Sequence, residues 1–290
     1  MTRKVELRTP DELRKMRAAG LLVARTLAVL RDAIAPGVTT GRLDELARAT
    51  IEGAGAVPSF LGYHGFPAST CISVGAEVIH GIPRPDRVLA MGDVVSIDCG
   101  AIVDGWHGDA AFTAVVGGWE AAAPGVRELV ERTEQALWAG LAAAVPGGRL
   151  GDIGTAVDGV LAAAGLGGLR DYTGHGIGRA MHLPPDVENR PGGSDRRLRL
   201  EPGLALAIEP MATLGVPAVH ELDDGWTVVT DDGRPGAHWE HTVAVTPSGP
   251  WVLTAFDGGL SRLGERASDE ARREAARGRS RAADAEQRPR

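Results

Sequence analysis

The sequence contains one internal repeat, and this repeat constrains the fold more than any other feature. "GDVVSID" (92–98) matches "GLALAIE" (203–209), and "YHGF" (63–66) matches "GHGI" (174–177), both at an offset of 111 residues. Further matches at an offset of 110 are Pro36-Gly37 with Pro146-Gly147, Gly41 with Gly151, and Leu43 with Ile153. The nearly constant offset predicts two related halves, each a pair of helices followed by a strand and a hairpin. We expect the halves to share one cleft within a single domain.

Local signals place the elements of these halves. Thr9-Pro10 with Glu12 is typical of a capped helix start. "DVVSIDCGAIVDGWHGDAAFTAVV" (93–116) predicts a β-hairpin that turns at Asp104-Gly105. Further helices are expected at about 40–53, 122–144 and 151–164, and further strands at about 70–79, 204–213, 226–230, 241–246 and 251–255.

The hairpin carries a pair of aspartates. A two-residue turn at 104–105 places position 98 opposite 111, so Asp98 and Asp109 become diagonal neighbours on one face, within about 7–8 Å. Asp98 ends an apolar run, where an uncompensated carboxylate is costly to bury. A structural aspartate at a strand end is the alternative for Asp98 alone, but the pair together favours a bound cation.

The second half supplies matching carboxylates. Glu209 ends "LALAI" as Asp98 ends "VVSI", and Glu240 opens a strand as we expect Asp109 to do. An ion pair with an arginine would explain either glutamate alone. Four carboxylates facing one another with an imidazole are better explained by two divalent cations.

The imidazoles come from "DYTGHGIGRAMHLPP" (171–185), which holds two of the chain's eight histidines, His175 and His182. A helix would place both on one face, but its glycines would cost about 1 kcal/mol each. We therefore expect an irregular segment whose backbone passes close to the cleft and presents both imidazoles to a bound group.

Several long blocks resemble a known family: "YHGFPASTCISVGAEVIHGIP", "SIDCGAIVDGWHGDAAFT", "YTGHGIGRAMHLPPDV", "AIEPM" and "EHTVAVT". Together they are similar to type I, bacterial, methionine aminopeptidases over about residues 5–256. The resemblance implies an α+β pita-bread fold (creatinase/aminopeptidase-like), with two pseudo-symmetric αα-β halves around a central cleft. It assigns residues 1–258 to one metallo-aminopeptidase domain.

The same resemblance implies a dinuclear metal site. Its five ligands carry over as Asp98, Asp109, His175, Glu209 and Glu240. Asp109 and Glu240 would bridge two divalent ions, Asp98 would chelate one, and His175 with Glu209 would complete the other. Co²⁺, Mn²⁺, Fe²⁺ and Zn²⁺ all suit these ligands.

The implied reaction is hydrolytic removal of an N-terminal methionine that precedes a small residue. A hydroxide held between the metals would attack the first peptide carbonyl. Glu209 would accept a proton, His182 would donate to the carbonyl oxygen, and His80 would contact the substrate nitrogen and assist the leaving amine.

The methionine pocket follows from the same motifs. Its expected substrate-binding residues are Tyr63, His64, Phe66, Cys71, His80, His182 and Trp226, with Met181 beside His182. The family often has tyrosine in place of Phe66 and an aromatic residue in place of Met181, so the shape of the pocket is left open. The repeat pairs His175 with His64 and His182 with Cys71.

Composition limits the setting. The chain has a formal net charge of −7, no apolar run long enough to span a membrane, and no signal-peptide pattern at its N-terminus. We therefore expect no membrane and no specific nucleic-acid partner. Cys71 and Cys99 cannot make a disulfide framework, which suits the cytoplasm. We expect a monomeric enzyme that acts on the N-termini of nascent polypeptides at the ribosome.

Residues 259–290 have a different composition. The thirty residues from Ser261 hold nine arginines, six acidic residues and one large aliphatic residue, Leu263. They predict a disordered or transiently helical tail, so truncation after Asp257 should leave activity intact. A tail that binds an acidic partner is the alternative.

The sequence argues against three alternative classes of protein. Prolidase-like and aminopeptidase P-like enzymes share the five ligands, but usually carry a large N-terminal domain where about 60 residues precede "YHGF" here. Eukaryotic-type methionine aminopeptidases carry an insertion, for which the 34 residues from His175 to Glu209 leave no room. A non-catalytic protein of this fold would have lost ligands that this chain keeps.

Overall fold

Helices and three sheets make up the chain, which the computed structural model describes over residues 5–286, with side chains through residue 277. The α-helices are α1 (Pro10–Ala33), α2 (Thr40–Gly53), α3 (Val126–Ala143), α4 (Leu150–Ala163), α5 (Leu260–Leu263) and α6 (Asp269–Glu286). Short 3₁₀ turns are η1 (Tyr63–Gly65), η2 (Trp119–Ala121) and η3 (Gly264–Arg266).

A nine-stranded sheet forms the centre of the molecule, with β1-β4-β5-β14-β9-β7-β8 in spatial order, β2 beside β4 and β15 beside β14. Its strands are β1 (Val57–Pro58), β2 (Thr70–Val74), β4 (Val94–Val103), β5 (Trp106–Val115), β7 (Gly174–Gly176), β8 (Leu183–Val187), β9 (Ala205–Ile208), β14 (Glu240–Thr246) and β15 (Gly249–Val252). Two small sheets contain β3 (Glu77–Ile79), β11 (Val219–Glu221) and β12 (Val228–Thr230), and β6 (Gly167–Gly168), β10 (Met211–Thr213) and β13 (Gly236–His238).

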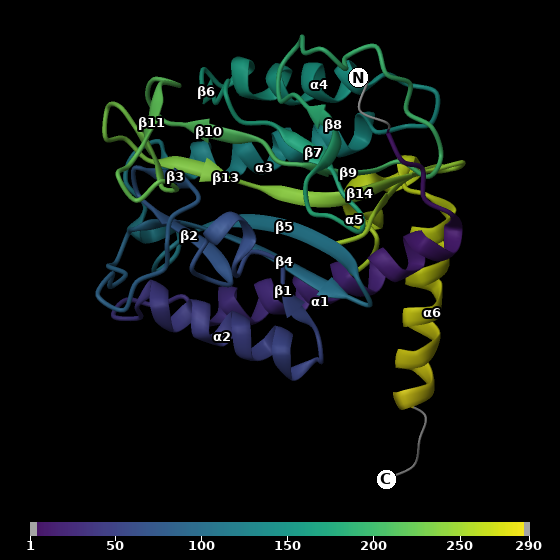
Figure 1. Ribbon diagram of the computed structural model, residues 1–290, viewed down its shortest axis with the longest axis horizontal. Coiled ribbons are helices and arrows are strands. Elements are labelled where there is room, and N and C mark those ends of the chain that lie inside the picture. The colour runs from purple at the N-terminus through teal and green to yellow at the C-terminus, as the bar shows by residue number, and fades with distance from the viewer. Residues whose placement is uncertain (1–4, 287–290) are drawn as a thin grey trace.

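The two predicted halves are present and meet at β5 and β14. In Figure 1 the first half, purple to blue, lies below that seam, and most of the second half, teal to yellow-green, lies above it. Corresponding helices begin in the same way: Gly37 N–H donates to the Leu89 carbonyl at 2.8 Å. Its counterpart Gly147 donates to Leu200, also at 2.8 Å. Both glycines have φ near +90°, a conformation that glycine adopts without strain.

The N-terminal helix begins as its sequence predicts. The Thr9 hydroxyl accepts from the Glu12 N–H at 3.3 Å, and the Glu12 carboxylate accepts from the Thr9 N–H at 2.8 Å. This reciprocal cap satisfies two backbone donors that have no partner inside the helix. It fixes the start of α1, which packs along β4 and β5.

Strand alternation decides which side chains face the helices. Val95, Ile97 and Cys99 of β4 lie in a buried cluster with residues of α1 and α2. Because successive side chains point to opposite faces, Asp98 faces away from these helices. The hairpin has the predicted register, with Asp98 opposite Ala111 across β5. The helical layer thus covers one face of the sheet and leaves the other face for a site.

The C-terminal segment, for which the sequence predicted disorder or a transient helix, is helical over α5 and α6. Leu263, Ala267 and Ala271 are buried against the rest of the protein. Arg17 of α1 is 4% exposed and pairs with Glu274 at 2.8 Å. Its guanidinium also donates to the carbonyls of Val252, Leu253, Ala255 and Phe256. The segment has too few large apolar residues to fold by itself, and small buried residues and one ion pair therefore hold it against the protein. Beyond these contacts α6 projects from the body (Figure 1).

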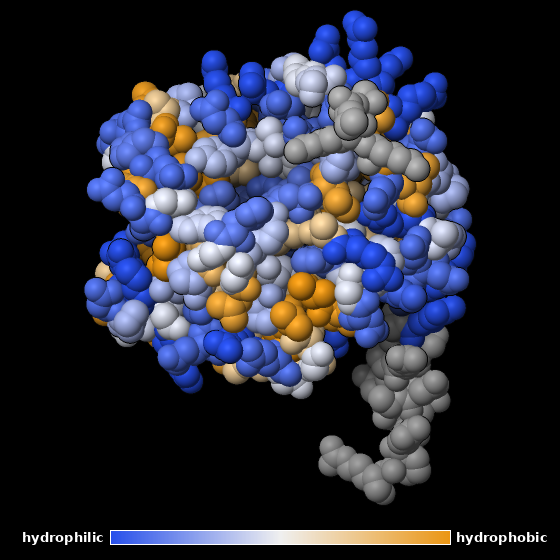
Figure 2. All heavy atoms as spheres, viewed as in Figure 1, coloured by the Kyte–Doolittle hydropathy of each residue, from blue (hydrophilic) through white to orange (hydrophobic). Residues whose placement is uncertain are grey.

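The exterior is mostly hydrophilic on the face drawn in Figure 2, where hydrophobic side chains form small separate groups. Within residues 5–286, no helix combines the length and the apolar character needed to cross a bilayer.

Candidate metal centre and substrate cavity

A cavity of about 140 Å³ opens on the face of the central sheet that the helices leave free. Its lining residues are Phe60, Tyr63, Phe66, Cys71, His80, Asp98, Asp109, His175, Met181, His182, Glu209, Trp226 and Glu240. The cavity therefore brings together all five predicted metal ligands. It also contains His80 and His182, for which the sequence predicted catalytic roles, and most of the predicted pocket residues. His64 does not line this cavity; it is exposed and contacts the Tyr63 ring edge-on at 4.4 Å.

Sheet register places three of the carboxylates. Ala111 of β5 lies between Asp98 on β4 and Glu240 on β14, so both carboxylates share its face. Asp109 is two residues before Ala111 and points to the same face. Asp109 lies within β5 rather than at its start, whereas Glu240 opens β14 as expected.

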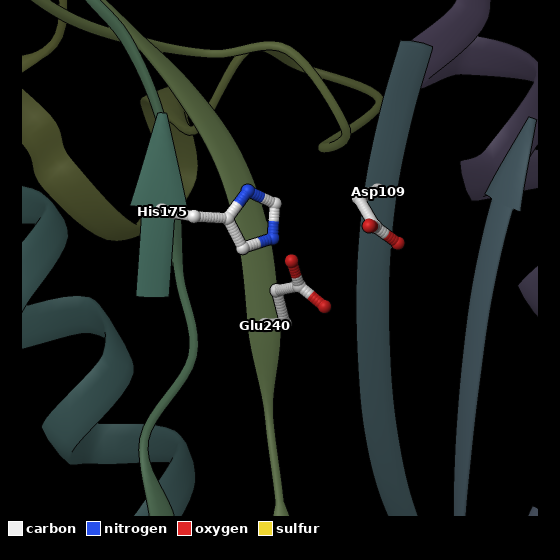
Figure 3. A group of neighbouring side chains, drawn as sticks. All are labelled: Asp109, His175 and Glu240. Atoms are coloured by element: carbon white, nitrogen blue, oxygen red, sulfur yellow. The ribbon is translucent and has the colours of Figure 1, made fainter. Parts of the chain in front are cut away.

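A candidate cation site lies between the two halves. Asp109, His175 and Glu240 each offer a ligand atom within 4.8 Å of the others, and all three side chains are buried. Figure 3 shows Asp109 and His175 on opposite sides of Glu240, whose carboxylate points toward the space between them. The centre therefore needs both halves.

Glu209 joins this group through its two oxygens. One lies 3.5 Å from Nε2 of His175, and the other lies 3.6 Å from Nε2 of His238. The sequence analysis did not include His238. It precedes Glu240 by two residues, and the period of a strand could have placed both on one face.

Buried polar atoms without partners indicate that the residues fit divalent cations. One oxygen each of Asp98, Asp109 and Glu240 is buried with no hydrogen-bond partner among the described residues. Burial raises the pKa of Asp109 to about 7. Burial and neighbouring carboxylates raise the pKa values of Asp98, Glu209 and Glu240 well above their usual range. Cations would compensate the buried charges and occupy the free oxygens.

The histidines of the cavity are neutral at neutral pH. Burial lowers the pKa of His175 to about 3 and that of His80 to about 4. The Nδ1–H of His175 donates to the Gly176 carbonyl at 2.9 Å, so its Nε2 keeps a free lone pair. A neutral imidazole held in this way is the form that binds a metal.

The glycines around His175 have a packing reason. A Cβ on Gly174 would lie 2.3 Å from the Ala207 oxygen, and one on Gly176 would lie 2.3 Å from the Pro184 oxygen. Larger residues would push β7 away from β8 and β9. Residues 174–176 form a short strand whose backbone passes close to its neighbouring strands, whereas residues 177–182, which end at His182, are irregular as expected.

One wall of the cavity is apolar. Phe60, Phe66, Cys71 and Met181 form a buried cluster, and Trp226 packs edge-on against Phe66 at 5.0 Å. Burial raises the pKa of the Cys71 thiol well above its usual value, so the thiol stays uncharged. Phe60 is a lining residue that the sequence analysis missed, since its "PSFLG" context carries no chemical motif.

Carboxylates and an imidazole at the base of a cavity with an apolar wall are typical of a metallohydrolase. A family model described as metallopeptidase family M24 matches residues 14–247. The chain therefore belongs to metallopeptidase family M24.

Curated relatives give the same result over most of the chain. It is 51% identical to methionine aminopeptidase 1 of Mycobacterium tuberculosis (strain CDC 1551 / Oshkosh) over 258 residues, which cover 87% of this chain and 96% of the relative. It is 44% identical to methionine aminopeptidase 1 of Bacillus subtilis (strain 168), with 85% and 98% covered.

Solved structures confirm the predicted α+β pita-bread fold. Methionine aminopeptidase from Rickettsia prowazekii aligns with a TM-score of 0.83 at 38% identity, covering 87% of this chain and 100% of that chain. A prolidase from Pyrococcus furiosus aligns with a TM-score of 0.70 at 22% identity, covering 86% of this chain and 65% of that chain. The prolidase likeness shows the shared fold alone.

Proposed function

We propose that this chain removes the N-terminal methionine from nascent proteins and peptides that have a small second residue. The observation that carries the proposal is a metal-ligand set from both halves beside an apolar cavity wall. The names of the similar methionine aminopeptidases support the same reaction. The expected setting is the cytoplasm, where a monomer would act on chains leaving the ribosome.

Two divalent cations would be held by Asp98, Asp109, His175, Glu209 and Glu240. When bound, such cations supply Lewis acidity and lower the pKa of a coordinated water toward neutrality. The unpartnered oxygens of three of these carboxylates support this assignment.

Other side chains would orient the substrate and move protons. Neutral His182 can donate to the carbonyl oxygen of the scissile bond, where negative charge develops. His80 lines the same cavity and can hold the substrate nitrogen. Glu209 would accept a proton at a carboxylate oxygen, since one of its oxygens lies 3.5 Å from Nε2 of His175 at the candidate metal centre.

The apolar wall would select the methionine side chain. Phe66, Cys71, Met181 and Trp226 offer soft, uncharged contacts that suit an unbranched thioether. Charged side chains would lose their solvation there, which argues against acidic or basic first residues.

Peptide hydrolysis tests the proposal. Protein loaded with Mn²⁺ or Co²⁺ should release methionine from Met-Ala-Ser, and should act far less on Leu-Ala-Ser and on Xaa-Pro dipeptides. No methionine release would refute the proposed function, and cleavage only before proline would favour a prolidase-like activity.

Two single variants separate metal binding from substrate activation. His175→Ala should lose metal and turnover together. His182→Ala should keep its metal and lower kcat by about a hundredfold, because it removes a donor to the carbonyl oxygen. Metal analysis beside steady-state kinetics checks both, and metal loss in His182→Ala would contradict its assigned role.

A further inference from the structure

A hydrogen bond connects the two halves at the edge of the cavity. The Tyr63 hydroxyl lies 2.8 Å from Nδ1 of His182, and the two rings are tilted with centroids 5.3 Å apart. Tyr63 belongs to the first half, and His182 belongs to the second. The His182 ring also lies 4.3 Å from the His175 ring, beside the candidate metal centre.

Backbone hydrogen bonds hold Tyr63 in place. Its N–H donates to the Phe60 carbonyl at 2.9 Å, and its carbonyl accepts from the Phe66 N–H at 2.9 Å. The loop also contains Gly62 at φ +81° and His64 at φ +48°, which is a strained conformation for a residue with a side chain. A loop held in this way fixes the position of the phenol.

The direction of the Tyr63–His182 hydrogen bond determines which nitrogen of His182 can act on substrate. A neutral imidazole carries one N–H, and the partner of one nitrogen sets the state of the other. If the hydroxyl donates to Nδ1, the proton lies on Nε2. Nε2–H is then free to donate to a carbonyl oxygen in the cavity.

We propose that Tyr63 is a positioning residue that donates to Nδ1 of His182 and holds His182 as the Nε2–H tautomer. This inference rests on the proposed function, in which His182 donates to the substrate carbonyl. Tyr63 thus does more than form part of the wall. Phe66 lines the same cavity with a ring and no hydroxyl, so contact with an apolar side chain does not require the phenolic oxygen.

Tyr63→Phe tests this role because it removes the hydroxyl and keeps the ring. Metal-loaded Tyr63→Phe should show a kcat lowered about tenfold with little change in KM, since one neutral hydrogen bond is lost. Tyr63→Leu, which also removes the ring, should raise KM as well. Unchanged melting temperature and metal content in Tyr63→Phe exclude a general structural defect.

The double variant shows whether Tyr63 acts through His182. In the His182→Ala background, Tyr63→Phe should cause no further loss of kcat. An equal tenfold loss in both backgrounds would overturn the proposal, as would an unchanged kcat in Tyr63→Phe.

A measurement without turnover separates this inference from the proposed function. Long-range ¹⁵N–¹H spectra of the histidine rings report the tautomer in metal-free protein, and the His182→Ala spectrum identifies the His182 signals. His182 should be the Nε2–H tautomer in the unsubstituted chain and a mixture in Tyr63→Phe. An Nδ1–H tautomer, or a spectrum unaffected by Tyr63→Phe, overturns the proposal even where methionine release is normal. A chain that releases no methionine but shows the expected tautomers refutes only the proposed function.

Discussion

At the scale of single residues, the candidate centre places carboxylates where their charge is costly. Asp98, Asp109, Glu209 and Glu240 face a common space, and three of them hold an oxygen without a partner. An ordinary core would have paired these oxygens with donors. Such a site is stable with its acids protonated or with cations bound, so protons and metal ions compete for it.

This competition predicts how stability depends on pH. A carboxyl with a raised folded-state pKa adds stability that is lost as pH rises toward that pKa, because the unfolded chain has already released its proton. Asp109, with a pKa of about 7, should therefore lower the melting temperature of metal-free protein as pH rises to about 7. Burial raises the pKa values of Asp98, Glu209 and Glu240 well above their usual range, so these groups should continue the decrease toward pH 8. The cost is about 1.4 kcal/mol per pH unit for each proton retained. Below pH 6.5, neutral buried histidines such as His80 act in the opposite direction.

Calorimetry across pH 6.5–8, without metal and with excess Mn²⁺, measures this effect. Mn²⁺ should raise the melting temperature more at pH 8 than at pH 6.5, because fewer protons must be displaced. A flat profile in the metal-free protein would show that these carboxyls are ionised without a cation.

Close backbone approach gives a second prediction at single residues. Gly174→Ala would place a methyl group 2.3 Å from the Ala207 oxygen and should displace β7 with its His175. We expect a loss of about 2 kcal/mol in stability together with weaker metal binding. Gly159→Ala is the matched control, since Gly159 is exposed on α4 and its Cβ would meet nothing within 4 Å, so the change should stabilise the helix by up to about 1 kcal/mol. Denaturant unfolding and metal titration compare the two, and equal effects would argue against the packing explanation.

At the scale of elements, local sequence signals were sufficient to predict a helix or a hairpin wherever the residues of a turn or a helix cap are specific. Asp104-Gly105 predicted the hairpin and its register, and α2 spans the 40–53 expected. The sequence left open whether the tail is disordered or helical, because its packing depends on a distant residue. Arg17 looks like a solvent-facing helix residue in the sequence, yet it is buried and binds Glu274 and four carbonyls. Composition cannot reveal such a long-range contact.

This contact changes the expected effect of truncation. Removing all residues after Asp257 would expose the apolar surface under Leu263 and Ala271 and leave Arg17 without Glu274. We now expect about 3 kcal/mol lower stability, with kcat/KM of the remaining folded protein unchanged at 25 °C. Glu274→Gln should give only part of that loss. Thermal unfolding beside peptide kinetics checks this, and an unchanged melting temperature would show that the helical tail contributes nothing to the fold.

At the scale of the whole molecule, the repeat predicted two halves around one site. It could not predict how weakly the strands at the seam are paired. The ladder between β5 and β14 joins Glu240 to Ala111 and His241 to Ala110. Thr242 adds side-chain hydrogen bonds to the Asp109 backbone. The candidate ligands come from both sides of this short ladder, so a bound cation would cross-link the halves.

Hydrogen exchange can test this cross-link directly. On addition of Mn²⁺ to the metal-free chain, amide exchange should slow together in β4 and β5 of the first half and in β7, β9 and β14 of the second. Asp109→Asn should abolish the protection on both sides, because it removes a ligand from one half of a shared centre. His182→Ala, which leaves the proposed ligands in place, should keep it. Protection confined to one half would mean that the cation binds that half alone, and the assignment of bridging carboxylates at the seam would then be wrong.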